Sequence, residues 1–316
     1  MNHLSKPQAV MLMMAVFLIG VLLSVFIGPG GFSVQELSAV LCFRVPRTVI
    51  GVLAGGVLAV VGGALQGVMR NPLVDPWTLG VASGAALGVT VAIVLGWQSN
   101  VIMPVMGFAG GALATVVVYI LARGKERLSI TRLVLAGVIV NFFFSSLVIL
   151  LIVLSRHTLG EAIYLMMGYL GLTFTRKAMW LLLGSGLIAL VGCSWLIFHS
   201  RELDIISLDE DVALSLGVDA ERFSREIVLI SSVAVGIVVA WTGVISFVGL
   251  VVPHLVRMLL GPRHSDVLAG SFILGAGILL LADVLVRVLT PAGLPLSVIT
   301  ALIGVPFFIY LLRKSS

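Results

Sequence analysis

Hydrophobic residues along this chain gather into about ten long runs, and short polar segments separate the runs. The runs are close to the roughly 20 residues that a helix needs to cross a bilayer, and they lack the two-residue alternation of a lipid-facing strand. Because a bilayer offers no hydrogen-bond partners to an open backbone, such runs predict transmembrane helices. We expect an all-α, polytopic membrane protein with spans near residues 9–27, 48–68, 78–96, 101–122, 132–154, 178–198, 225–241, 245–260, 267–287 and 297–312.

The composition agrees with lipid as the main solvent. Hydrophobic residues make up 60% of the chain and charged residues 10%, and the mean hydropathy is +1.21. Such a chain has too little polar surface to cover a soluble globule of its size. Glycines inside the runs, Gly55 and Gly62 among them, predict close packing of helix backbones. We therefore predict a single transmembrane domain over residues 1–316.

Neither the first run nor the cysteines indicate a further feature. The run at 9–27 is long enough to span and lacks a small-x-small cleavage site, so it is interpreted as the first span and not as a signal peptide. Cys42 and Cys193 lie far apart in or beside apolar stretches, where a small buried thiol is the simplest interpretation. The sequence predicts no disulfide framework, metal site or cofactor.

The basic residues give the orientation. With the N-terminus in the cytoplasm, 13 of the 19 basic residues fall on cytoplasmic segments. The rule that cytoplasmic loops are rich in Lys and Arg favours this orientation, and an even number of spans returns the C-terminus to the same side. The six basic residues expected on the outer side are Arg44, Arg47, Arg156, Arg176, Lys177 and Arg287.

The turn before the second span carries two of these cations. Arg44 and Arg47 flank Val45-Pro46 at the point where a helix begins. Cations at a helix N-terminus oppose the helix dipole, so their presence calls for a reason. One interpretation is that they reach toward lipid phosphates at the interface, and the other is that they form a socket for acidic residues of a partner protein.

The longest polar connection, at about residues 203–224, is predicted to lie in the cytoplasm and to contain a short helix. Acidic residues suit its first turn, and a glycine is placed to end it. Its apolar side chains need a surface to pack against, which favours a helix that docks on a soluble motor over an irregular loop. The residues are Asp209, Glu210, Asp211, Val212, Ala213, Leu214, Ser215, Leu216 and Gly217.

Three further groups of residues inside the spans are candidates for function. Asn141, Phe142, Ser145 and Ser146 in the fifth span are candidates to line a translocation path; alternatively the aromatic residues there face lipid. Asp283 and Arg287 stand four apart and are predicted to pair on one helix face. His254 follows Pro253, and a structural role is favoured for it over metal binding or proton transfer.

Taken together, several segments resemble one known family. They are RVPR at 44–47, GGALQGVMRNPLVDPWTLGVASGA at 62–85, DVALSLGV at 211–218, GVISFVGLVVPHLVR at 243–257, AD-x3-R at 282–287 and ALIGVPFF at 301–308. In order and spacing they resemble the FecCD-like permeases of bacterial ABC importers for ferric siderophores, haem and cobalamin. The resemblance covers nearly the whole chain.

The resemblance implies an assembly in the bacterial cytoplasmic membrane. Two permease protomers, usually a homodimer, would surround the path, with two ATP-binding subunits in the cytoplasm and a substrate-binding protein outside. Arg44, Arg47 and Arg287 match arginines that dock the binding protein, and Asp209 to Gly217 match the helix that couples to the ATPase. The chain itself has no GxxxxGK[ST] phosphate loop, so ATP hydrolysis is expected of its partners.

The main alternative is a secondary transporter driven by an ion gradient. Such proteins place a carboxylate or a broken helix near the middle of the bilayer, whereas almost every acidic residue here lies in a loop or at a span end. A membrane scaffold would not explain the arginine and docking-helix segments. An intramembrane enzyme would need a converging catalytic set, and the sequence suggests none.

Overall fold

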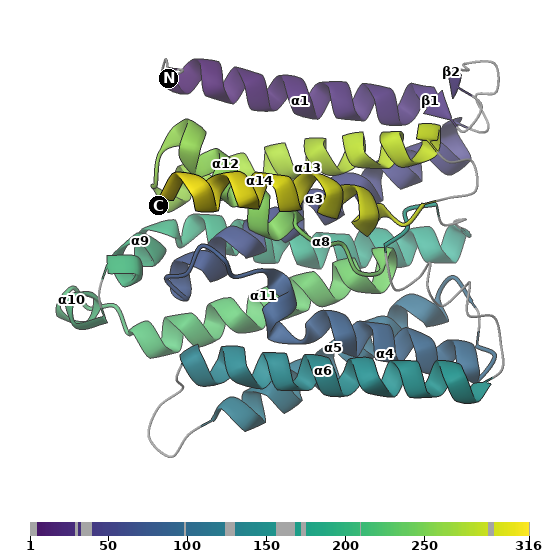
Figure 1. Ribbon diagram of the computed structural model, residues 1–316, viewed down its shortest axis with the longest axis horizontal. Coiled ribbons are helices and arrows are strands. Elements are labelled where there is room, and N and C mark those ends of the chain that lie inside the picture. The colour runs from purple at the N-terminus through teal and green to yellow at the C-terminus, as the bar shows by residue number, and fades with distance from the viewer. Residues whose placement is uncertain are drawn as a thin grey trace.

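The computed structural model describes residues 5–28, 31–32, 40–97, 99–123, 130–155, 168–171, 175–208, 210–289 and 294–315, which form a bundle of helices (Figure 1). The long or apolar helices are α1 (Lys6–Phe26), α3 (Val45–Val68), α4 (Val81–Val94), α5 (Ile102–Ala122), α6 (Ile130–Ser155), α8 (Arg176–Phe198), α11 (Ala220–Thr242), α12 (Val248–Leu260), α13 (His264–Leu289) and α14 (Leu296–Ser315). Each overlaps one predicted span.

Shorter elements join these helices. They are the two-residue strands β1 (Ile27–Gly28) and β2 (Gly31–Phe32), which pair antiparallel, a π-helical turn (Val40–Arg44), a 3₁₀ helix (Pro76–Leu79), and the helices α9 (Ser200–Leu208) and α10 (Glu210–Ser215). Helices α9 and α10 project from one end of the bundle, opposite β1 and β2 (Figure 1).

The all-α membrane fold is confirmed. Seven of the described helices are long and apolar enough to cross a bilayer, and α4, α12 and α14 are shorter apolar helices. The predicted spans at 78–96 and 245–260 begin too early, because apolar residues there form irregular backbone. Gly80 has φ of 71° before α4, and Phe247 has φ of 69° before α12, so each helix starts only after a left-handed residue.

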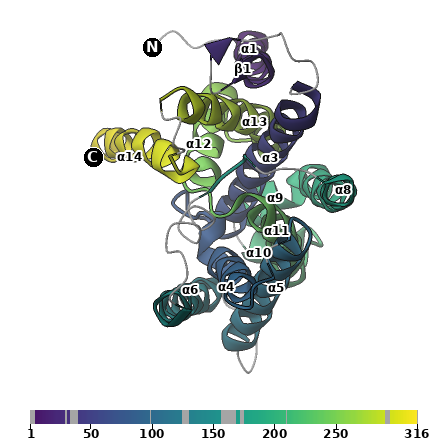
Figure 2. The same cartoon turned by 90° about the vertical axis from the view of Figure 1, so that its right-hand side faces the viewer.

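Helix α3 lies at the centre of the bundle, between α1 at one edge and α6 at the other (Figures 1 and 2). In an 18-residue window of the apolar stretch that contains it, 83% of the residues are buried. A Cβ on Gly55 would collide with the carbonyl of Gly275 in α13, and one on Gly62 would collide with the carbonyl of Gly249 in α12. The predicted packing of backbones through glycine is therefore confirmed at both crossings.

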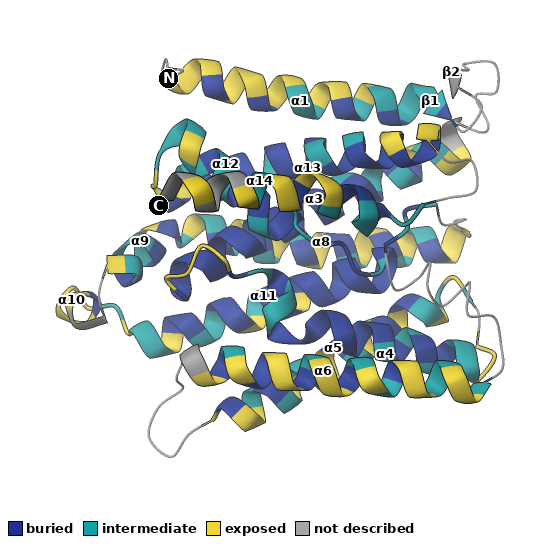
Figure 3. Cartoon of the chain, viewed as in Figure 1, coloured by how far each residue is buried: buried dark blue, intermediate teal, exposed yellow. Residues whose placement is uncertain are grey.

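The outer helices carry exposed apolar residues, and Figure 3 marks exposed positions along α1 and α6. Examples are Leu22 in α1, Phe142 in α6, Leu187 in α8 and Leu302 in α14. In water such a surface would be unfavourable, but lipid chains solvate it. Burial at the centre and apolar exposure at the rim are what a membrane-embedded bundle requires.

Candidate functional sites at the two ends of the bundle

Arginines gather where the C-terminal ends of α1 and α13 meet the N-terminal end of α3. Arg44 precedes α3, Arg47 lies in its first turn, and Arg287 lies in the last turn of α13. This end is opposite α9 and α10 (Figure 1). The fold thus brings together the three arginines that the sequence singled out, although 240 residues separate them; we call these three residues and Asp283 the arginine cluster.

Asp283 binds two of these arginines. The guanidinium group of Arg47 donates from Nε to Oδ2 at 3.0 Å and from Nη2 to Oδ1 at 2.7 Å. Nη2 of Arg287 lies 3.1 Å from Oδ2, which confirms the predicted pairing of Asp283 with Arg287 on one helix face. The exposed fractions of the side chains are 2% for Asp283, 5% for Arg287 and 15% for Arg47. The ring of Tyr169 lies beneath Arg47, with its centroid 5.7 Å from Cζ.

The arginines also donate hydrogen bonds to the carbonyls at the C-terminal end of helix α1. Nη1 of Arg44 donates to the carbonyls of Val25 and Phe26, and Nη1 of Arg287 donates to the carbonyls of Ser24 and Ile27. The last carbonyls of a helix lack partners within it, and cations there are favourable for its dipole. This answers the question raised by the sequence: these cations at the start of α3 serve the end of α1 and a buried carboxylate.

The cluster keeps a positive charge. Arg287 is close enough to Arg44 and Arg47 to be repelled by both, while Asp283 attracts it. Among the described residues, Nε of Arg287 is buried and has no hydrogen-bond partner. Arg47 and Arg287 are mostly enclosed by protein in this structure. They therefore neither reach lipid phosphates nor form an open socket. Docking of a partner here stays a prediction.

At the other end of the bundle, the short helix predicted from the sequence is present as α10. The N–H of Val218 donates to the carbonyl of Ala213, and the N–H of Gly217 donates to that of Leu214. With φ of 79° at Gly217, this is the Schellman ending, so the predicted glycine cap is confirmed. Asp209 lies outside the described residues, as do the side chains of Glu210 and Asp211.

The apolar side chains of α10 and its flanks point away from the protein. Leu208 is 73% exposed, Leu214 70% and Leu216 61%, whereas Ala213 is fully buried against the bundle. Ser215 is exposed and bonds only to the backbone of its own helix among the described residues. An apolar patch next to the polar helix α9 is typical of a protein contact surface.

Helix α9 is fixed to the bundle by two polar contacts that the sequence did not reveal. Oδ1 of Asp204 lies 2.6 Å from Nδ1 of His264 and also accepts from the backbone N–H of His264 at 3.0 Å. Nε of Arg70, the residue with φ of 46° just after α3, donates to the carbonyl of Ile206 at 3.0 Å. Helix α9 therefore links α10 to both α3 and α13.

A buried amide connects α3 to α12. Pro253 has no N–H, so the carbonyl of Gly249 loses its partner within α12. Nε2 of Gln66 donates to that carbonyl at 3.3 Å and to the next one, of Leu250, at 3.2 Å. Oε1 of the same amide accepts from Arg257 at 2.6 Å. A side chain from a neighbouring helix thus satisfies the backbone carbonyl that the proline frees, as a membrane-embedded helix requires.

Comparison with known proteins identifies the family of this chain. A family model described as the FecCD transport family matches residues 8–314. The chain belongs to this family.

Curated members of FecCD-type systems are similar over most of their length. The cobalamin import system permease BtuC of Halobacterium salinarum is 37% identical over 293 residues, which cover 91% of this chain and 77% of that protein. The hemin transport system permease HmuU of Yersinia pestis is 36% identical over 280 residues, covering 86% and 82%. A solved structure described as an inward-facing conformation of a metal-chelate type ABC transporter has a TM-score of 0.86 and 33% identity, and covers 98% of this chain and all of that one.

Within this FecCD protomer, the candidate path residues lie on an outer helix. Asn141 and Ser145 share one half-exposed face of α6, while Phe142 and Ser146 are exposed on the next face, where Ser146 donates to the carbonyl of Phe142. Among the described residues, Oδ1 of Asn141 is buried without a partner. Their role in transport stays a prediction.

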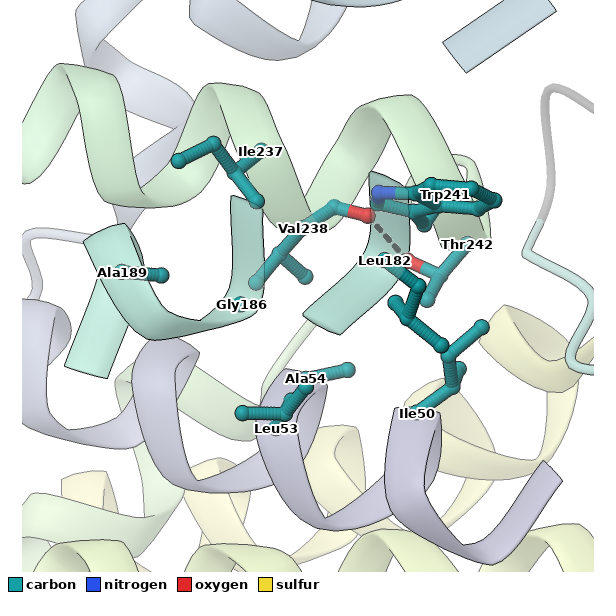
Figure 4. A pocket seen from close by; sticks show the side chains of 10 residues that line it. All are labelled: Ile50, Leu53, Ala54, Leu182, Gly186, Ala189, Ile237, Val238, Trp241 and Thr242. Atoms are coloured by element: carbon teal, nitrogen blue, oxygen red, sulfur yellow. Dashed lines mark hydrogen bonds between the residues drawn. The ribbon is translucent and has the colours of Figure 1, made fainter. Parts of the chain in front are cut away.

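A narrow, partly open fissure lies between α3, α8 and α11 (Figure 4). Its lining is apolar, and the polar atoms of Trp241 and Thr242 bond to Ser185 and Val238 within the protein. Among the described residues, no three His, Cys, Asp or Glu side chains are grouped to hold a metal.

Proposed function

We propose that this FecCD chain is the membrane-spanning subunit of an ATP-driven importer for a metal chelate, meaning a ferric siderophore, haem or cobalamin. The observation that carries the proposal is the family match over residues 8–314, which includes both the arginine cluster and α10. Relatives named for cobalamin and hemin transport support this substrate class.

The proposed orientation places α9, α10 and both termini in the cytoplasm and the arginine cluster outside. All ten helices would then cross the membrane, including the shorter apolar helices α4, α12 and α14. The excess of basic residues on the α10 side supports this orientation.

The proposed partners follow from the two ends. Two ATP-binding subunits would cover the exposed leucines of α10 and supply ATP hydrolysis, and a substrate-binding protein would present acidic groups to the arginine cluster. Closure of the ATPase would push α10, and α9 would pass this movement to α3 and α13 through Arg70 and His264. The coupling segment is the one predicted, Asp209 to Gly217.

A second permease protomer would complete the path. The exposed face of α6 with Phe142 is suited to lie against a second copy or a paired homologue. The translocation path would then run between protomers, lined in part by Asn141, Phe142, Ser145 and Ser146.

Transport into proteoliposomes tests the proposal. The chain is purified together with an ATP-binding subunit and a binding protein encoded beside it, and uptake of labelled haem, cobalamin and a ferric siderophore is measured in parallel. We expect uptake of one cargo that requires both ATP and the binding protein. Uptake driven by an ion gradient without ATP would instead establish a secondary transporter.

A further inference from the structure

The carboxylate of Asp283 already occupies the place where an acidic group of a docking protein would bind. It makes a two-pronged contact with Arg47, at 2.7 and 3.0 Å, and a single contact with Arg287 at 3.1 Å. A two-pronged arginine–carboxylate pair is among the strongest polar contacts between side chains. Any external carboxylate that binds these arginines must therefore compete with a group inside the protein.

We propose that Asp283 is an internal counterion that holds Arg47 while no partner is docked, and that a carboxylate of the binding protein takes Arg47 from it on docking. This inference rests on the proposed function, and it concerns the regulation of the same docking site. Asp283 would thus set the strength of docking without touching the partner.

The two arginines are held differently, and the difference identifies which one is exchanged. Arg287 is 5% exposed and also donates to the carbonyls of Ser24 and Ile27, so it is fixed to α1. Arg47 is 15% exposed, and all of its hydrogen bonds to described residues go to Asp283. Arg47 can therefore turn outward while Arg287 stays in place.

The exchange avoids an unpaired buried charge. When Arg47 turns toward an external carboxylate, Asp283 keeps Arg287 as its partner. Leaving a buried carboxylate with no partner would be strongly unfavourable, and the second arginine prevents this. The surplus positive charge of the cluster, which includes Arg44, is what makes the site able to accept a further anion.

The exchange also changes how two helices are joined. The contact between Arg47 and Asp283 links the ends of α3 and α13 across 236 positions of sequence. Without it, the contact through Gly55 and Gly275 deeper in the bundle would remain. Docking outside would therefore loosen one end of the helix pair that α9 contacts at the other end.

Docking affinity in nanodiscs tests the inference. The complete complex is titrated with the fluorescently labelled binding protein encoded beside this chain, and the dissociation constant is compared with that of Asp283→Asn. We expect Asp283→Asn to dock about tenfold more tightly, because Arg47 is no longer held, and Arg47→Gln to dock about tenfold more weakly. Unchanged or weaker docking of Asp283→Asn would overturn the inference, since Asp283 would then position the arginines for the partner.

Three further variants test the inference even if Asp283→Asn does not fold. Because Asp283→Asn leaves Arg287 buried without its anion and can prevent folding, Arg287→Gln is compared with the charge-balanced pair Asp283→Asn/Arg287→Gln. The pair should dock about tenfold more tightly than Arg287→Gln alone, and equal or weaker docking would overturn the inference. Asp266→Asn is the matched control: Asp266 pairs with Lys6 at 2.8 Å at the opposite end of α13, so docking should not change. Wild-type complex that does not dock at all would overturn the proposed function itself.

Discussion

Replacing Gln66 by Met should destabilise the bundle by an amount that depends on Pro253. The change removes a hydrogen bond to the charged Arg257, at 2.6 Å, which contributes about 1.5–3 kcal/mol. It also leaves the carbonyl of Gly249 buried without a partner, which costs about 1–3 kcal/mol. Because Gln66 is only 3% exposed, water cannot replace either bond, and we expect a total loss of about 3–5 kcal/mol.

A double-mutant cycle isolates the part that comes from the proline. In Pro253→Ala, residue 253 regains an N–H one helical turn from the carbonyl of Gly249 and can satisfy it. The cost of Gln66→Met should therefore fall by about 1–3 kcal/mol in that background. Equilibrium unfolding in mixed micelles, followed by circular dichroism, gives the four free energies of unfolding. Equal costs in the two backgrounds, within about 0.5 kcal/mol, would refute the assignment of Gln66 as the partner of the freed carbonyl.

Three further predictions address coupling, packing and pH. Leu214→Asp with Leu216→Asp should abolish stimulation of ATP hydrolysis by the binding protein while stability changes by less than about 0.5 kcal/mol, because both side chains are exposed; intact stimulation would argue against coupling at α10. Gly275→Ala should lower thermal stability, since its Cβ would lie 2.5 Å from the carbonyl of the facing glycine in α3, whereas Gly184→Ala, with nothing within 4 Å, should not. Burial raises the pKa of Asp75 from 3.8 to about 6, so its contribution to stability is fully present below pH 3.8 and is lost as the pH rises through 6. Oδ1 of Asp75 accepts from the N–H of Trp77 at the start of the 3₁₀ helix, and Asp75→Asn keeps an oxygen for this bond. The variant should flatten the fall in unfolding free energy between pH 4 and 6; an unchanged slope would contradict the assignment.

The positions of the helices could be predicted from hydropathy because lipid imposes both length and apolar surface on a span. The starts of α4 and α12 could not, since they depend on left-handed backbone at Gly80 and Phe247 that an apolar run does not signal. The end of α10 at Gly217 could be predicted, because a glycine after a short segment that begins with acidic residues is a local signal for a helix end.

In the candidate sites, too, contacts between residues near in sequence could be predicted, and contacts between distant residues could not. The pairing of Asp283 with Arg287 follows from a spacing of four residues, and the structure contains it. The stronger contact of Asp283 with Arg47 joins residues 236 positions apart and depends on how α3 crosses α13. Likewise, the sequence predicts no partner for His264, because its contact with Asp204 depends on the position of α9.

The polar ending of α1 has a consequence for how the protein is made. The carbonyl of Ile27 receives its hydrogen bond from Arg287, a residue synthesised 260 positions later. Helix α1 also packs through Gly20 against Gly277, so most of its protein contacts come from near the end of the chain. While the ribosome makes the intervening helices, the carbonyls of Ser24 and Ile27 must wait for Arg287, whereas Arg44 is already available to those of Val25 and Phe26. The bundle closes only when α13 is inserted, and a chain cut short before it would leave an unfinished helix end for membrane proteases to recognise.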